Sequence, residues 1–233
     1  MDRETYIGNL LKTYAPVAVL SEKNGCRVLR LRHKTMGKDI VLHSLPTVCR
    51  AYEILHTVRS VHLPLVLDTV ELEDGQIVLE EYIEGMTVAQ VMETGRYRPY
   101  GARKVISAVC DALAVMHERG IVHRDVKPEN VMITPMGRVV LIDFNASRQV
   151  SAASHDTVIL GTVGYASPEQ MGLTQSDART DIYALGVLYN VMLTGEHPSV
   201  KIAGGRAGRV IRKCTAIHPA DRFPSVTHLA DAL

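Results

Sequence analysis

The first third of the chain alternates between apolar and polar positions in short runs. PVAVL, CRVLRLRH and IVLHSL are separated by SEKNG and KTMGKD, and two further apolar runs flank Asp74-Gly75. A period of two between apolar positions, bounded by Gly, Asn and Asp, is typical of β-strands joined by tight turns. The spacing at 47–60 is instead helical. We therefore predict an antiparallel sheet of five strands with one helix.

After Gly85 the apolar residues follow the spacing of helices. They recur three or four positions apart from Val105 to Met116, and Gly120 stands just past the end that this pattern predicts. Residues 181–193 are apolar on nearly every face, which predicts a helix that is buried all round. The second part of the chain is therefore expected to be mainly helical, with the boundary between the two parts at 81–85.

Composition and charge narrow the classes of partner. The 26 Lys and Arg nearly balance the 25 Asp and Glu, which argues against nucleic acid or an anionic membrane as an electrostatically bound partner. Asp111 and Asn190 interrupt the longest apolar stretches, so none reaches the roughly 18 residues of a membrane-spanning helix. The cysteines lie far apart and form no CxxC pair, which favours a reducing compartment, the cytoplasm: Cys26, Cys49, Cys110 and Cys214.

Residues 121–133, IVHRDVKPENVMI, place acids, bases and an amide between two apolar ends, which is unusual for a segment that is only buried. HRDVKPEN at 123–130 resembles the catalytic loop of the protein kinase family. DFN at 143–145 resembles the metal-binding DFG motif of that family, and SPE at 167–169 resembles its APE motif. Three motifs in the family's order are a specific signal.

The spacing of these motifs also matches the family. Asn130 follows Asp125 after five positions and Asp143 follows it after eighteen, and the resemblance extends to Asp181 and Arg222. It implies an α+β fold, the two-lobed protein kinase-like fold, over residues 1–233. The N-lobe would be a small antiparallel sheet with one helix at about 1–82, the hinge would lie at about 81–85, and the mainly helical C-lobe would span about 85–233.

The resemblance implies ATP and Mg²⁺ as cofactors, a protein as substrate, and a role for each polar residue of the loop. Asp125 would orient or deprotonate the acceptor hydroxyl, and Lys127 would contact the transferring phosphoryl group. Asn130 and Asp143 would bind Mg²⁺, a hard cation that prefers carboxylate and amide oxygens. Lys127, two positions after the acid, is typical of Ser/Thr kinases. Arg124 suggests control by phosphorylation of the following segment, with Ser151, Ser154 and Thr157 as acceptors, and Thr162 matches a family threonine that bonds the catalytic residues.

The positions expected to bind the nucleotide match the family pattern less well than the catalytic loop does. The backbone of Glu81 and Ile83 would hold adenine. The three glycine positions of the family's phosphate-binding loop fall on Ser21, Lys23 and Cys26. Glycine there lets backbone N–H groups approach phosphate without a Cβ in the way, so phosphate binding is expected to be weaker. Lys23 could compensate with its charge, or it could be a solvated turn residue.

Three further positions depart from the family pattern. The lysine that binds the α and β phosphates is replaced by His43, while Glu53 matches the helix glutamate that pairs with it. Only a protonated imidazole could partly replace the ammonium group. Glu80 adds a carboxylate that would repel phosphate unless a cation intervenes. Asn145 replaces the glycine of DFG, and asparagine is among the better substitutes where φ is positive.

These observations leave three hypotheses open. The first is a small bacterial-type Ser/Thr protein kinase domain, favoured by the intact catalytic loop. The second is a pseudokinase that binds partners, with or without nucleotide, and transfers no phosphate, favoured by the altered residues at 21–26 and at His43. The third is a kinase-like enzyme that transfers another part of ATP. The basic residues of a short helix near the C-terminus are interpreted as a solvated face: Arg206, Arg209, Arg212 and Lys213.

Overall fold

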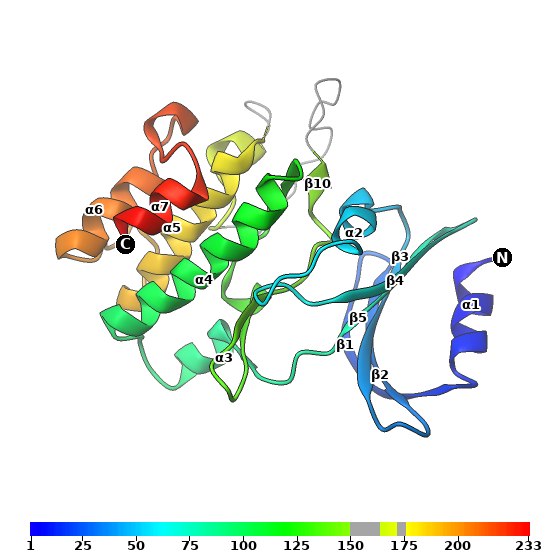
Figure 1. Cartoon of the computed structure of the whole chain (residues 1–233). Helices are drawn as coiled ribbons and strands as arrows, with labels where there is room; N and C mark the ends of the chain where they lie inside the picture. The colour runs from blue at the N-terminus through cyan, green and yellow to red at the C-terminus, as the bar shows by residue number, and fades with distance from the viewer. Residues whose placement is uncertain (150–163, 172–175) are drawn as a thin grey trace. The chain divides into compact units, whose positions relative to one another are not determined.

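The computed structural model describes residues 1–149, 164–171 and 176–233, which form two compact units (Figure 1). The first unit contains Met1–Ser60 and Pro64–Ile83, and the second contains Val61–Leu63 and Glu84–Leu233. The change of unit after Ile83 lies within the predicted boundary region. The suggested regulatory residues lie outside the described residues: Ser151, Ser154, Thr157 and Thr162.

The first unit is built on a five-stranded sheet, as predicted. Its order is β1-β2-β3-β5-β4, and every pair of neighbouring strands is antiparallel. The turn between β4 and β5 needs Gly75, because φ there is +146° and a Cβ would lie 2.0 Å from the carbonyl oxygen of Leu45. The strands are β1 (Tyr14–Lys23), β2 (Cys26–His33), β3 (Asp39–Leu45), β4 (Val66–Leu72) and β5 (Gly75–Glu81).

The prediction of one helix in this unit is wrong, because the structure has two. The additional helix is α1 (Arg3–Leu10), which begins where the side chain of Asp2 accepts a hydrogen bond from the backbone N–H of Thr5 at 2.7 Å. The predicted helix is α2 (Arg50–Leu55), shorter than 47–60. It ends because the next backbone bonds, Thr57 to Ile54 and Val58 to Leu55, reach back only three residues and tighten the last turn.

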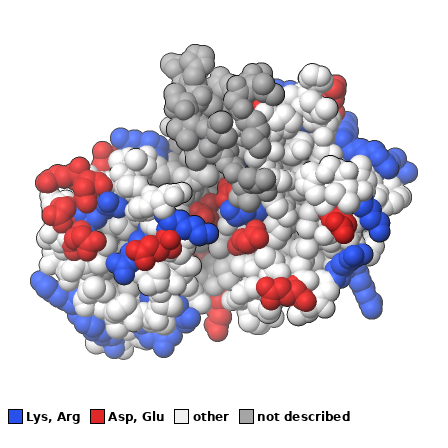
Figure 2. Space-filling view, turned by 180° about the vertical axis from the view of Figure 1, so that it is seen from behind, with Lys and Arg blue, Asp and Glu red and all other residues white. Residues whose placement is uncertain are grey.

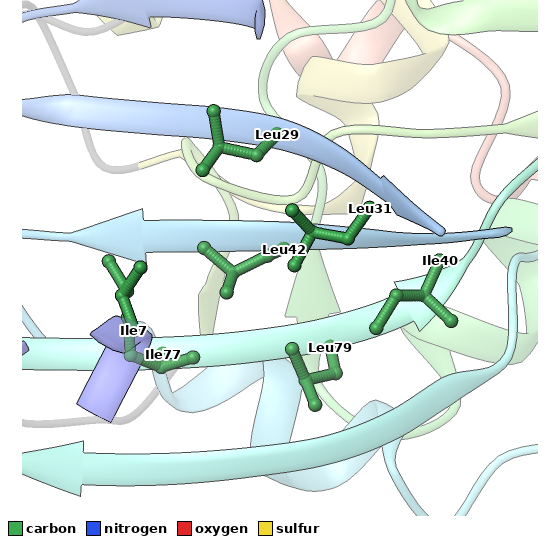
Figure 3. Close-up of a cluster of buried hydrophobic side chains, with 7 residues drawn as sticks. All are labelled: Ile7, Leu29, Leu31, Ile40, Leu42, Ile77 and Leu79. Atoms are coloured by element: carbon green, nitrogen blue, oxygen red, sulfur yellow. The ribbon is translucent and has the colours of Figure 1, made fainter. Parts of the chain in front are cut away.

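α1 covers one face of the sheet. Its Ile7 is 6% exposed and joins a buried cluster with six residues of β2, β3 and β5 (Figure 3): Leu29, Leu31, Ile40, Leu42, Ile77 and Leu79. Three of these six are at most 1% exposed, so the sheet face is sealed. The ion pair between Arg3 and Asp74, 3.2 Å long, ties the helix to the turn between β4 and β5.

Ile7→Ala is expected to lower the free energy of unfolding by about 2–5 kcal/mol, because truncation removes buried apolar atoms and leaves a cavity against the sheet. Urea denaturation of the whole chain measures this change. Met36→Ala provides the control, since Met36 is 70% exposed and its truncation should change stability by less than about 0.5 kcal/mol. Equal effects of the two substitutions would show that α1 does not stabilise the sheet.

The second unit is mainly helical, with short strands and 3₁₀ turns between its helices. The helices are α3 (Val88–Glu93), α4 (Pro99–His117), α5 (Ala178–Thr194), α6 (Gly205–Cys214) and α7 (Val226–Ala232). The strands are β6 (Met86–Thr87), β7 (Ile121–Val122), β8 (Val131–Ile133), β9 (Val139–Leu141) and β10 (Arg148–Gln149). The 3₁₀ turns are η1 (Pro128–Asn130), η2 (Pro168–Met171) and η3 (Pro219–Asp221).

α5 is the buried helix that the apolar pattern predicts, and it lies against α4, α6 and α7. Its one buried amide, Asn190, is fully buried and organises the segment that leads to α6. The Asn190 Nδ2 donates to the carbonyl oxygens of Glu196 and Lys201, both at 2.7 Å, and Oδ1 accepts from the N–H of Ala203 at 2.9 Å. A residue that breaks the apolar run in the sequence therefore holds a short loop in place.

The surface carries both signs of charge. On the face in Figure 2, Lys and Arg side chains are interspersed with Asp and Glu. This agrees with the small formal net charge of +1. In the part of the chain that the structure describes, no helix is both long and apolar enough to cross a membrane.

Candidate active site

The acidic residue of the predicted catalytic loop lies at the centre of a small hydrogen-bonded group in the second unit. The loop runs between β7 and η1, and Asp125 is partly buried there. Its Oδ2 accepts from Nζ of Lys127 at 2.5 Å and from Nδ2 of Asn130 at 3.0 Å. Asn130 Nδ2 also donates to the backbone oxygen of Asp125 at 2.9 Å. The carboxylate is thus held in one orientation by a cation and an amide.

A backbone hydrogen bond brings the two predicted metal ligands, Asn130 and Asp143, together. The backbone N–H of Ile142 donates to the backbone oxygen of Asn130 at 2.9 Å. This bond brings Asp143, the residue after Ile142, close to Asn130. The amide nitrogen of Asn130 is bonded to Asp125, so its Oδ1 is the atom that it would offer a cation. One carboxylate and one amide oxygen fit Mg²⁺, which commonly keeps water and substrate phosphate as its other ligands.

The backbone at the predicted metal-binding motif differs from expectation. We expected Asn145 to replace glycine at a positive φ, but the positive φ of this motif, +67°, belongs to Asp143. The N–H of Asn145 donates to Oδ1 of Asp143 at 3.2 Å, so the side chain stabilises its own turn. Asn145 therefore meets no backbone strain of the kind that glycine would relieve.

Asp181 of α5 stabilises the catalytic loop through hydrogen bonds to its backbone. It is fully buried and accepts from the N–H of His123 at 2.9 Å and of Arg124 at 2.8 Å, and its Oδ2 lies 2.7 Å from Nε2 of His117. Burial works to raise the pKa of Asp181, but the hydrogen bond and charge of His117, together with the charge of His123 and the backbone hydrogen bond from Arg124, lower it overall. Burial lowers the pKa of His123. The charged carboxylate stabilises Arg124 in its unusual backbone conformation, φ +70°.

A second brace joins the motif at 167–169 to the C-terminal part of the chain. Arg222 donates to both oxygens of Glu169, at 2.6 and 2.9 Å, with both side chains buried. Burial works to raise the pKa of Glu169, but the guanidinium lowers it overall. Arg222 and Asp181, to which the resemblance extends, therefore both stabilise the fold around the catalytic loop. His117 and Gln170 were not identified from the sequence, because neither belongs to one of the three motifs. Nε2 of Gln170 donates to the backbone oxygen of Arg124 at 2.8 Å.

In the first unit His43 has a different partner from the one that the resemblance implies. Its Nε2 lies 2.8 Å from Oε2 of Glu80 on the neighbouring strand β5, and both side chains are 5% exposed. Glu53 of α2 instead pairs with Arg50 at 2.5 Å and is 39% exposed. A histidine–glutamate pair within the sheet therefore replaces the expected pair between strand and helix.

The predicted phosphate-binding loop is a tight hairpin. β1 continues to Lys23 and β2 begins at Cys26, which pair directly, so only Asn24 and Gly25 form the turn. Both have positive φ, 51° and 76°, as in the type I′ turns that join twisted strands. Ser21 and Lys23 are therefore strand residues, and both are exposed.

The two residues expected to hold adenine end the first unit. The N–H of Glu81 donates to the oxygen of Leu65 at 2.8 Å, and the N–H of Leu65 donates to Oε2 of Glu81 at 3.1 Å. The N–H and the side chain of Glu81 are therefore both used in contacts within the first unit. Ile83 is buried, and it is the last residue of the unit.

The pair of His43 and Glu80 is expected to be strongly coupled in stability. His43→Leu leaves a buried carboxylate without this partner and should lower the free energy of unfolding by about 3–5 kcal/mol. Glu80→Leu should cost less, and the double replacement should recover part of the loss, giving a coupling of about 0.5–3 kcal/mol in a double-mutant cycle by urea denaturation. Additive single effects would show that the 2.8 Å contact contributes little.

Comparison with known proteins adds the relatives of this chain. A family model described as a protein kinase domain matches residues 24–229. The chain is 40% identical over 142 residues to "Probable serine/threonine-protein kinase PknB" of Corynebacterium glutamicum, across 57% of this chain and 22% of that protein. It is 44% identical over 131 residues to serine/threonine-protein kinase PknL of Mycobacterium tuberculosis, across 54% of this chain and 33% of that protein. The chain therefore matches a third or less of the length of these relatives.

Proposed function

Because the chain belongs to the protein kinase family, as the match over residues 24–229 shows, we propose that it transfers the γ-phosphate of ATP to serine or threonine hydroxyls of a protein. The observation that carries this proposal is the carboxylate of Asp125, held by Lys127 and Asn130 within one short loop. The relatives, which are named serine/threonine-protein kinases, support the choice of acceptor. Phosphoryl transfer needs mainly such positioned groups, since little covalent chemistry falls to the protein.

Each residue of the loop has a defined task in this proposal. Asp125 orients the acceptor hydroxyl and takes its proton as the oxygen bonds to the γ-phosphorus and the bond to the β–γ bridging oxygen breaks. Lys127 places its ammonium beside the same carboxylate, where it can also contact the transferring group. Asn130 and Asp143 would hold Mg²⁺, which neutralises phosphate charge when bound. The family generally uses ATP and Mg²⁺.

The residues proposed for nucleotide binding in the first unit form a weaker set. Lys23 supplies an exposed cation on a tight hairpin, and the backbone of Glu81 and Ile83 would hold adenine. His43 would serve phosphate only if the nucleotide competes with Glu80 for its imidazole. Glu53 would take part only if it leaves Arg50. We therefore expect ATP to bind less tightly than to a kinase with a lysine at position 43.

The pairing of His43 with Glu80 also favours a second candidate function. A pseudokinase needs a folded domain and partner surfaces but no phosphate-binding lysine, and a buried histidine–glutamate pair stabilises the sheet without nucleotide.

Protein substrates are expected for the family, and their identity is a property of the whole protein. A cytoplasmic location, where ATP is available, remains a prediction.

One experiment separates these functions. The purified chain is incubated with Mg²⁺, γ-labelled ATP and casein, and the intact masses of chain and casein are measured. An added phosphate group that requires Asp125 supports the kinase, and an added adenylate group would show transfer of another part of ATP. Folded chain that binds a partner and transfers neither group would support the pseudokinase. Asp125→Asn is the matched control for contaminating kinases.

A further inference from the structure

The second unit contains a cavity of about 650 Å³ that none of the proposed catalytic residues lines. It lies where α4 begins, α5 ends and α6 begins, and its wall includes Pro99, Leu193 and Gly204. Small-molecule sites commonly have volumes of roughly 300–1,000 Å³. The cavity is therefore large enough for a small ligand without any change in the fold.

The wall of this cavity is cationic. Among the residues that the structure describes, no Asp or Glu side chain lines the cavity, and four of its lining residues carry a positive charge: Arg96, Arg103, Lys201 and Arg206. Within the described ranges of the chain, none of these four forms an ion pair with a carboxylate. Like charges around one cavity repel each other, and a bound anion would relieve that repulsion. Arg206, which we interpreted as part of a solvated face, belongs to this wall.

Backbone N–H donors point to the same kind of ligand. α6 begins here, at Gly204, with no side chain capping its first N–H groups. These groups favour an anion that accepts several hydrogen bonds.

The rest of the wall is aromatic and apolar. Tyr100 and Tyr189 line it together with Pro99, Leu193 and Val210. Burial raises the pKa of Tyr189, while the charges of Arg103 and Arg206, which line the same cavity, work to lower it. A bare inorganic ion would leave this apolar surface in contact with water. The wall therefore favours a ligand with an organic body next to its anionic group.

We propose that this cavity is a binding site for a small organic phosphate. A phosphate dianion matches four cations and several backbone N–H donors better than a carboxylate, which one arginine can satisfy in a bidentate pair. The site is preformed, because Asn190 bonds Lys201 and Ala203 and so fixes the loop that carries part of the wall. The site would be separate from the catalytic loop and would not depend on phosphotransfer.

Calorimetric titration of the whole chain with phenyl phosphate tests this proposal at fixed ionic strength. Saturable binding is expected, and Arg103→Ala should weaken it at least tenfold, because it removes a charged hydrogen-bond donor from the wall. Arg206→Ala should act similarly, although its Nε also donates to the backbone oxygen of Ala232 at 3.1 Å. Arg209→Ala is the matched control, since Arg209 is exposed on the same helix outside the cavity and should change the affinity less than twofold.

Several outcomes would overturn the proposal. These are the absence of saturable binding, or equal losses in Arg209→Ala and Arg103→Ala. Inorganic phosphate that binds as tightly as phenyl phosphate would contradict the role of the aromatic wall. Benzoate that binds as tightly would contradict the preference for phosphate. If phosphatidylserine vesicles bind in an Arg103-dependent way while phenyl phosphate does not, the surface contacts a membrane and the small-molecule site is rejected.

Discussion

Asp125→Asn is expected to lower the rate of phosphotransfer by about 10²–10⁴-fold, the usual contribution of a positioned general base. The amide keeps the shape of the side chain but cannot take the proton of the acceptor hydroxyl. It would also turn an N–H₂ group or an uncharged oxygen toward Lys127, which now lies 2.5 Å from the carboxylate. Affinity for Mg²⁺ and ATP should change by only a few fold, because Asp143 and Asn130 remain. The initial rate with γ-labelled ATP and the calorimetric affinity measure these two effects separately.

Glu129→Gln is the matched control for this substitution. Glu129 lies in the same loop, is exposed, and loses the same charge, so its replacement should leave the rate within about twofold. A thermal unfolding curve unchanged by Asp125→Asn would confirm that folding is intact. Phosphotransfer that survives Asp125→Asn would assign the proton acceptor elsewhere, and loss of rate in both variants would point to the charge of the loop rather than to this carboxylate.

Local patterns were sufficient to predict the sheet and the buried helix. Apolar and polar residues alternate in β2 and β3, and Asp74-Gly75 predicts the turn between β4 and β5. Because alternation gives a strand one apolar face, the strands pair in the register that places these faces on the same side of the sheet. α5 was equally readable, because it is apolar on every face over several turns. The spacing from Asp125 to Asn130 and Asp143 predicted a shared site, and the contacts of Asp125 with Asn130 agree with it.

Long-range packing explains what the sequence did not predict. α1 has only eight residues and little amphipathic pattern, and it is stabilised by the contact of Ile7 with the sheet, which no local signal reveals. The partner of His43 depends on the register between β3 and β5, where His43 faces Val78 and Val41 faces Glu80. The cationic cavity joins residues of three separate helical regions. Sequence spacing alone could not bring such residues together.

Asp181→Asn is expected to lower the free energy of unfolding by about 3–5 kcal/mol, the range found when one partner of a buried charged pair is removed. The carboxylate accepts three hydrogen bonds within the buried base of the catalytic loop, from His117, His123 and Arg124. An amide of the same shape can accept at its oxygen only, and its N–H₂ would face another donor. Asp177→Asn, at the partly buried N-cap of the same helix, should cost less than about 1 kcal/mol, because asparagine caps a helix about as well as aspartate and the lost ion pair with Arg179 lies near the surface.

The pH dependence of this effect follows from the lowered pKa of Asp181. Since its pKa in the folded state is below the ordinary value of 3.8, its stabilising contribution is complete above that value and is lost as pH falls through the folded pKa. The lowered pKa of His123 acts in the same direction, because the unfolded state begins to take up a proton below about 6.5. Urea denaturation from pH 7 to 3 should therefore show a gap between wild type and Asp181→Asn that is large at pH 7 and narrows below 3.8. A gap that stays constant over this range would mean that the charge of Asp181 does not support the catalytic loop.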